Sequence, residues 1–205
     1  MPEVERRGVI GFLRSGLPTL PAVRLDAERI YLRPPRARDW RAWAALREES
    51  RDFLAPWEPT WPPDALVRAA YIRRLRRQQA DWRNDEGYSF LIVRRGDDVL
   101  LGGIGLSNVR RGVAQMASLG YWIGERFARR GYMTEAGRTT LGFAFRHLGL
   151  HRVEAFCLPT NEASRHLLEA IGFVREGYAR SYLRIDGAWR DHVMYAVLRE
   201  DVFGD

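Results

Sequence analysis

Residues 119–173 read LGYWIGERFARRGYMTEAGRTTLGFAFRHLGLHRVEAFCLPTNEASRHLLEAIGF, and this stretch decides how the chain folds. Residues 119–123 are typical of a strand, and the apolar stripe that follows predicts a helix from Gly131 to about His147. Residues 153–158 predict a second strand, and a second helix is predicted between Asn161 and the Gly-Phe pair at 172–173. The chain is therefore expected to pass twice from a strand into a helix.

A basic glycine turn, ARRGYM at residues 128–133, joins the first of these strands to its helix. Backbone N–H groups in the first turn of a helix have no intrahelical partner and point at whatever lies in front of the helix. Because Arg129 and Arg130 stand beside them, the predicted occupant is a pyrophosphate. The alternative is a loop with two solvated arginines. The N–H groups expected to hold the pyrophosphate are those of Gly131, Tyr132, Met133 and Thr134.

The composition excludes several kinds of site. All 33 basic residues are arginines, which excludes a Gly-Lys-Ser/Thr phosphate-binding loop, a Schiff-base lysine and a kinase lysine. The single cysteine, Cys157, cannot form an internal disulfide, and this fits a reducing compartment. His147 and His151 stand four residues apart, but Gly149 interrupts the helix between them. No metal site is therefore predicted.

The length of 205 residues fits one well-buried domain, expected at residues 28–205 behind an N-terminal extension at residues 1–27. The extension has a short apolar patch broken by Gly11 and lacks a small-residue cleavage site, so no signal peptide is predicted. No apolar run reaches the length of a membrane span, and a cytoplasmic protein is expected. The net charge of +7 indicates an acidic partner (RNA, a ribosomal surface or an anionic cofactor) or else a solvated arginine face.

The rest of the chain predicts further strands and helices. Asp39 is expected to cap a helix that runs to about Ser50, and a proline-punctuated loop leads to a second helix from Asp64 to about Arg83. Strands are predicted at residues 29–33, 88–94, 99–107, 174–183 and 192–198, with tight turns at 96–98 and 185–187. This order of elements predicts one mixed sheet covered by helices.

Several segments resemble a known family. They are RGYMTEA at 130–136 with LGLHRVE at 148–154, PTNEASR at 159–165 leading to IGFVREG at 171–177, and IDGAWRDH at 185–192. Together they resemble the branch of the GNAT superfamily that contains the ribosomal-protein alanine N-acetyltransferases. The resemblance covers nearly all of the chain from about Glu28 onward. The turn at 128–133 follows the family pattern in part, because Ala128 and Met133 depart from its first and last positions.

The resemblance implies an α+β (three-layer α/β) fold with a mixed, mostly antiparallel central sheet of about seven strands and about four flanking helices. It implies acetyl-CoA as the cofactor. The strand at 119–123 would splay away from the strand at 153–158, and backbone groups near Trp122 and Ile123 would then pair with the pantetheine amides. Asn161, with Ser164 and Arg165 close by, would lie against the pantetheine or the adenine. From its position alone, Asn161 is also the predicted N-cap of its helix.

Transfer from a thioester to an amine requires a neutral amine, a polarised carbonyl and a proton for the departing thiolate. Glu176 is the first candidate for the base, since its position matches a glutamate proposed as base in a related ribosomal N-acetyltransferase. The alternative is a surface glutamate paired with an arginine. Cys157 is the candidate for protonating the thiolate, or else a buried structural cysteine. Because the family reacts by direct attack in a ternary complex, Cys157 is not expected to be a covalent nucleophile.

The acceptor is expected between the first two helices and the hairpin at 182–190, beside Trp57 and Tyr182. The loop that carries Trp57 and Trp61 either gates the site or forms a packed lid. The resemblance implies an N-terminal α-amine, on a ribosomal protein, as the leading acceptor. The ordinary pKa of an α-amine, near 8, demands less of a base than the value of about 10.4 for lysine. The alternatives are a small amine (amino acid, polyamine or antibiotic), a non-catalytic acyl-CoA-binding module and an RNA-binding protein. The sequence leaves open whether the protein is a monomer or a homodimer and which acyl length it prefers.

Overall fold

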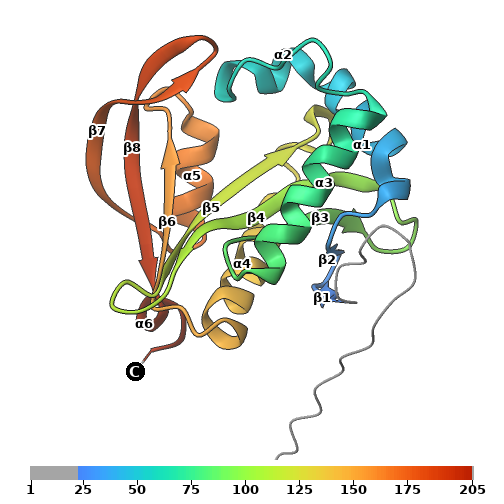
Figure 1. Cartoon of the computed structure of the whole chain (residues 1–205). Helices are drawn as coiled ribbons and strands as arrows, with labels where there is room; N and C mark the ends of the chain where they lie inside the picture. The colour runs from blue at the N-terminus through green and yellow to red at the C-terminus, as the bar shows by residue number, and fades with distance from the viewer. Residues whose placement is uncertain (1–22, 205) are drawn as a thin grey trace, which may run out of the picture.

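A computed structural model describes residues 23–204 of the chain (Figure 1). Its eight strands form one sheet in the order β1-β2-β3-β4-β5-β6-β8-β7. All neighbouring strands pair antiparallel except β5 and β6, which are parallel. The strands are β1 (Leu25–Asp26), β2 (Ile30–Arg33), β3 (Tyr88–Arg94), β4 (Leu100–Arg110), β5 (Met116–Ile123), β6 (Arg152–Cys157), β7 (Val174–Ile185) and β8 (Ala188–Leu198).

Helices lie on both faces of the sheet. The α-helices are α1 (Trp40–Glu49), α2 (Arg51–Leu54), α3 (Arg68–Arg83), α4 (Tyr132–Gly142), α5 (Glu162–Ala170) and α6 (Arg199–Phe203). Short 3-10 turns are η1 (Ala37–Asp39), η2 (Ala55–Trp57) and η3 (Glu125–Phe127), and a π-helical turn, η4 (Phe143–His147), continues α4. The helix that begins at α4 ends where Gly149 adopts a left-handed conformation, as predicted (φ +65°).

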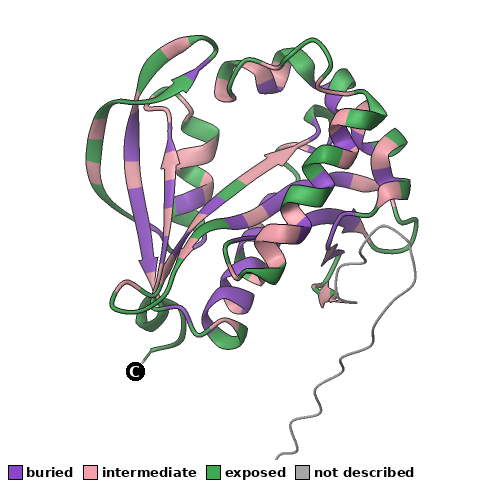
Figure 2. Cartoon of the chain, viewed as in Figure 1, coloured by how far each residue is buried: buried purple, intermediate pink, exposed green. Residues whose placement is uncertain are grey.

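The alternation of apolar residues along β2 and β3 explains the three layers. Ile30, Leu32, Phe90 and Ile92 point to one face, where α4 and α5 pack, and all four are buried. The residues between them point to the other face and pack against α1 and α3. Because successive side chains of a strand point to opposite faces, a strand that is apolar at every position must be covered on both sides. β3 and the first part of β4 are accordingly buried or half-buried (Figure 2).

The structure confirms the predicted fold class and adds one strand. Leu25 and Asp26 pair with Leu32 and Tyr31 at the edge of the sheet. The sheet therefore begins before residue 28, the expected start of the domain. The predicted N-terminal extension lies, up to residue 22, outside the described residues.

The expected cap of the first helix is wrong in one respect. Asp39 lies at the N-cap of α1, but its side chain caps none of that helix's N–H groups. The carboxylate accepts hydrogen bonds from the Arg33 guanidinium (2.7 and 2.8 Å) and from the Arg36 backbone N–H (2.7 Å). A partly buried arginine holds the carboxylate more strongly than a helix N–H does, because the hydrogen bond is charge-assisted on both sides.

The predicted start of the second long helix is also wrong by about one turn. α3 begins at Arg68 rather than at Asp64, and residues 62–67 form separate turns. The Leu66 carbonyl accepts a hydrogen bond from the Trp40 indole (2.9 Å), and Val67 has an extended backbone. This tertiary contact with α1 therefore moves the start of α3 to Arg68.

The described residues form neither a membrane-spanning helix nor a metal-binding cluster. Between residues 23 and 204 no helix combines the length and the apolar character needed to cross a bilayer. Across the same residues, histidine, cysteine and carboxylate side chains do not gather in groups of three or more that could hold a metal ion.

Candidate active site

β5 and β6 separate along their length, as the resemblance implied. Their parallel pairing joins residues 116–118 to residues 152–154 and extends no further. Beyond this point the strands diverge (Figure 1), while residues 119–123 stay paired with β4 on their other side. Within the described chain, the backbone of residues 119–123 has no strand partner on the open side. A cavity of about 1050 Å³ fills this opening.

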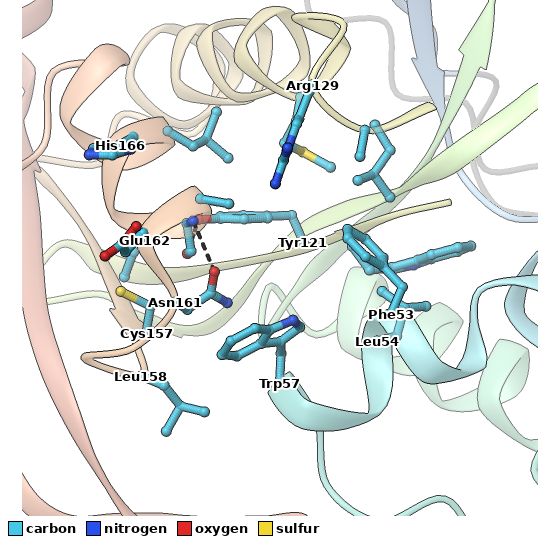
Figure 3. A pocket seen from close by; sticks show the side chains of 18 of the residues that line it. Phe53, Leu54, Trp57, Tyr121, Arg129, Cys157, Leu158, Asn161, Glu162 and His166 are labelled. Atoms are coloured by element: carbon cyan, nitrogen blue, oxygen red, sulfur yellow. Dashed lines mark hydrogen bonds between the residues drawn. The ribbon is translucent and has the colours of Figure 1, made fainter. Parts of the chain in front are cut away.

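Five parts of the chain line the cavity (Figure 3). They are the α2–η2 segment, the outer half of β5, the turn that leads into α4, the end of β6 with the first turns of α5, and β8 at His192. In Figure 3 the Arg129 side chain points into the cavity from one side and the Trp57 ring from another. The predicted site residues in the lining are Trp57, Trp122, Ile123, Arg129, Arg130, Gly131, Tyr132, Met133, Thr134, Cys157, Asn161 and Ser164.

The turn before α4 is shaped by two left-handed residues. Gly131 is the N-cap of α4 with φ +78° and ψ −3°, and Arg129 has φ +58°. No side chain caps the first N–H groups of α4. Arg29 supports the turn from behind, because its Nη1 donates to the Arg130 carbonyl (3.0 Å) and its Nε donates to Glu135 (3.0 Å). The uncapped end of the helix is thus held open toward the cavity.

These features fit coenzyme A. The uncapped N–H groups and the positive end of the α4 dipole suit a pyrophosphate, and Arg129 and Arg130 add two guanidinium groups beside it. The unpartnered backbone of β5 near Trp122 and Ile123 suits the amides of a pantetheine arm. Acetyl-CoA would supply an acetyl group activated as a thioester.

Neutral proton donors gather where β5 faces α5. Asn161 caps α5, as predicted, by accepting a hydrogen bond from the Ser164 N–H (3.0 Å). The Ser164 hydroxyl bonds to the Tyr121 hydroxyl (2.7 Å). Burial raises the pKa of the Tyr121 phenol. Burial also raises the pKa of the Cys157 thiol, with a smaller opposing effect of the Ser164 hydroxyl. Tyr121 and Cys157 therefore keep their protons at neutral pH, and both can donate a hydrogen bond into the cavity.

Glu176 lies outside the cavity lining. It stands on β7, and both of its carboxylate oxygens are bound by the Arg152 guanidinium, with Nη1 to Oε1 at 2.9 Å. Hydrogen bonding to Arg152 lowers the pKa of the Glu176 carboxylate. This is the arrangement of a strand glutamate paired with an arginine, and it makes Glu176 a weaker proton acceptor.

Two other predicted residues also stand outside the lining. Arg165 turns back onto the protein, donating to the Pro159 carbonyl (3.3 Å) and to the Tyr195 hydroxyl (3.5 Å). The Tyr182 ring packs 5.0 Å from Phe156 and 5.7 Å from His192, measured between ring centroids. Both of those neighbours line the cavity, so Tyr182 lies directly behind its wall.

The α2–η2 segment brings carboxylates that the sequence analysis did not single out. Asp52 and Glu58 line the cavity on either side of Trp57 in the chain. Glu58 is bound by the Arg47 guanidinium and by the Trp61 indole N–H (2.7 Å). Its carbonyl accepts from the Asp186 N–H (3.1 Å), which fastens this segment to the tip of the β7–β8 hairpin.

Tyr121, Glu162, His166 and His192 complete the titratable groups that sequence analysis missed in the lining. One signal was present in the sequence. His192 ends the segment IDGAWRDH, and that segment contributed to the family resemblance without being assigned a role.

Comparison with known proteins agrees with this geometry. The model of the acetyltransferase (GNAT) domain family matches residues 29–174. The probable N-acetyltransferase YjcK of Bacillus subtilis is 36% identical over 177 residues, 86% of this chain and 98% of that protein. The ribosomal protein uS5-alanine N-acetyltransferase of Escherichia coli is 35% identical over 183 residues, 89% of this chain and 94% of that protein.

A solved structure extends the comparison to three dimensions. Mycobacterium smegmatis RimJ in complex with CoA-disulfide matches with a TM-score of 0.81 at 33% identity, covering 85% of this chain and 84% of that chain. The chain therefore belongs to the GNAT family of acetyltransferases and is an acetyl-CoA-dependent N-acetyltransferase.

Proposed function

We propose that this enzyme acetylates the N-terminal α-amine of a protein and that its natural substrate is a ribosomal protein. The observation that carries the proposal is that positive and negative side chains line different parts of the cavity. The turn before α4 contributes Arg129 and Arg130, whereas the α2–η2 segment contributes the carboxylates of Asp52 and Glu58. Arginines attract the phosphates of the cofactor, and carboxylates accept hydrogen bonds from an ammonium group.

The chemistry favours an α-amine over a lysine side chain. With ordinary pKa values near 8 and 10.4, about a quarter of α-amines but only about one lysine in a thousand are neutral at pH 7.5. Glu58 is already hydrogen-bonded by Arg47 and Trp61, and it therefore has little power to deprotonate a lysine. The named relative that acetylates an alanine of ribosomal protein uS5 supports the same acceptor class.

A panel of acceptors tests the proposal. Thiol release from acetyl-CoA would be measured with peptides that begin with alanine or serine, and with amino acids, polyamines and aminoglycosides. We expect kcat/KM for the alanine or serine peptides to exceed that for every small amine by at least about tenfold. A small amine with the highest kcat/KM would contradict the proposal and assign the enzyme a small-molecule substrate.

The outer side of α3 supports a ribosomal location for the substrate. Five of its arginines are exposed, namely Arg68, Arg73, Arg76, Arg77 and Arg83. Among the described residues, Arg73 pairs with Asp64, and the other four have no salt-bridge partner. Helical arginines three and four residues apart lie about 5–6 Å from one another, which suits successive phosphates of RNA. This face would draw the enzyme to ribosomal RNA near its protein substrate.

Replacing Arg76 and Arg77 together by alanine is expected to weaken binding to small ribosomal subunits. The slope of log K against log salt should become shallower by about 1.4, because each lost phosphate contact on single-stranded RNA removes about 0.7. The control replaces Arg94 and Arg95 together by alanine, which removes the same charge. These two arginines differ from Arg76 and Arg77 in that they pair with Asp97 and Asp26. Equal weakening in both double variants would contradict a specific role for α3, and kcat/KM on a free peptide should change in neither.

A further inference from the structure

His192 is a buried histidine in the wall of the active-site cavity. It lies on β8, is 3% exposed, and lines the same cavity as the turn before α4. On the neighbouring strand β6, Cys157 pairs with Val193, the residue that follows His192. The Tyr182 ring meets the imidazole edge to face, with ring centroids 5.7 Å apart. The fold thus holds this imidazole in one place beside the end of β6.

A backbone hydrogen bond determines the tautomer of His192. Its Nδ1 lies 3.0 Å from the Arg190 carbonyl oxygen. A carbonyl oxygen can only accept, so Nδ1 carries the proton in this bond. In the neutral ring, Nε2 is then left with a free lone pair. A neutral imidazole held in this tautomer can accept a proton at Nε2.

The other titratable groups in the lining suit this role less well. Glu58 is already engaged by Arg47 and Trp61, and the pKa values of Tyr121 and Cys157 are raised by burial. Two of the remaining groups, Arg129 and Arg130, are guanidinium groups that stay protonated. Of the other titratable residues in the lining, Asp52, Glu162 and His166 are exposed. Tyr132 lies in the turn before α4, where the pyrophosphate is expected.

We propose that His192 is the general base of the acetyl transfer. This deepens the proposed function and rests on it. The His192 Nε2 takes one proton from the bound ammonium, directly or through one water, and leaves a neutral amine. The amine nitrogen attacks the acetyl carbon, so that a C–N bond forms and the C–S bond breaks. The second amine proton passes to the departing sulfur, which leaves as a thiol, and the imidazolium returns its proton to solvent. The products are an acetylated amine, CoA thiol and one proton.

The surroundings of His192 affect the pH dependence. Tyr182 faces the ring from β7, and Cys157 and Glu58 share the cavity with it. Asp191 is adjacent on β8, and its own pKa is lowered chiefly by hydrogen bonds from the Ser181 N–H and the Tyr178 hydroxyl. A base must be neutral to accept a proton. We therefore expect kcat/KM for the peptide to fall as the pH is lowered.

His192→Asn is the decisive variant, because the asparagine amide can still donate to the Arg190 carbonyl while Nε2 is removed. We expect about a 100-fold loss of kcat/KM for an alanine peptide at pH 7. The deficit should shrink as the pH rises past 8, where the α-amine is already neutral. Affinity for acetyl-CoA, measured by calorimetry, should stay within about twofold. His151→Gln, which alters an exposed histidine outside the cavity lining, should change none of these values.

A second readout does not depend on activity. In protein labelled with ¹⁵N-histidine, the His192 signals, identified by their loss in the variant, should show a protonated Nδ1 and an unprotonated Nε2. An Nε2–H tautomer would overturn the proposal. So would a loss in His192→Asn that is equal at every pH, or full activity in either His192→Asn or His192→Gln. Failure of the native enzyme to acetylate any peptide would instead contradict the proposed function, whatever the tautomer.

Discussion

Replacing Gly131 by valine is expected to raise the Kd for acetyl-CoA about 100-fold. Gly131 has φ +78°, and a β-branched side chain in this region costs about 1–3 kcal/mol. A Cβ at this position would also stand 3.1 Å from Nη2 of Arg29, the residue that supports the turn. Relief of either strain rotates the first N–H groups of α4 away from the pyrophosphate. Isothermal titration calorimetry with acetyl-CoA measures the change.

Gly112→Val is the matched control for this variant. Gly112 also has a positive φ (+63°), a Cβ there would meet no heavy atom within 4 Å, and the residue does not line the cavity. The two variants therefore carry similar backbone strain, but only Gly131→Val should lose cofactor affinity. Similar acetyl-CoA affinity in both would show that the turn before α4 does not hold the pyrophosphate.

Reversing the charge of Arg129 is the second change with a large expected effect. On the proposed placement of the pyrophosphate, Arg129→Glu removes a charge-assisted hydrogen bond, worth about 1.5–3 kcal/mol, and places a carboxylate beside the phosphates. We expect the Kd for acetyl-CoA to rise by about 100- to 1000-fold, and the loss should be partly recovered at high salt, which screens the repulsion. The measurement is cofactor titration at low and high ionic strength.

Arg126→Glu provides the comparison for Arg129→Glu. Arg126 lies three residues earlier, is exposed and does not line the cavity, so this variant makes the same charge change outside the site. Its effect on cofactor affinity should stay within about threefold. Equal weakening in both variants would show that cofactor affinity depends on the net charge of the protein and not on the Arg129 side chain in the cavity.

Local sequence signals predicted the central part of the fold. The turn at 128–133, the left-handed Gly149 and the cap at Asn161 are each determined within a few residues, and the structure places all three as predicted. The errors came from side-chain contacts that the helix signals do not include. Asp39 does not cap α1 because Arg33 binds its carboxylate, and α3 starts late because the indole of Trp40 takes the Leu66 carbonyl.

The same distinction applies to the site. Residues of the α4 turn were predictable because one short segment supplies both the N–H groups and the arginines. Glu176 and Arg165 could not be placed, because their partners Arg152 and Tyr195 stand 24 and 30 residues away in the chain. His192 was missed for a related reason. Only the pairing of β8 with β6 and β7 brings it to the cavity, and its one tautomer-fixing bond is to a backbone carbonyl, which no residue type reveals.

The most direct test of the central claim uses one peptide with two competing amines. A peptide with an N-terminal alanine and an internal lysine would be incubated with the enzyme and acetyl-CoA, and the acetylated position would be located by fragment-ion mass spectrometry. The enzyme contains no lysine, so any acetyl-lysine must come from the peptide. The α-amine should carry essentially all of the acetyl groups, in amounts equal to the thiol released. Acetylation of the lysine alone, or thiol release without peptide acetylation, would contradict the assignment.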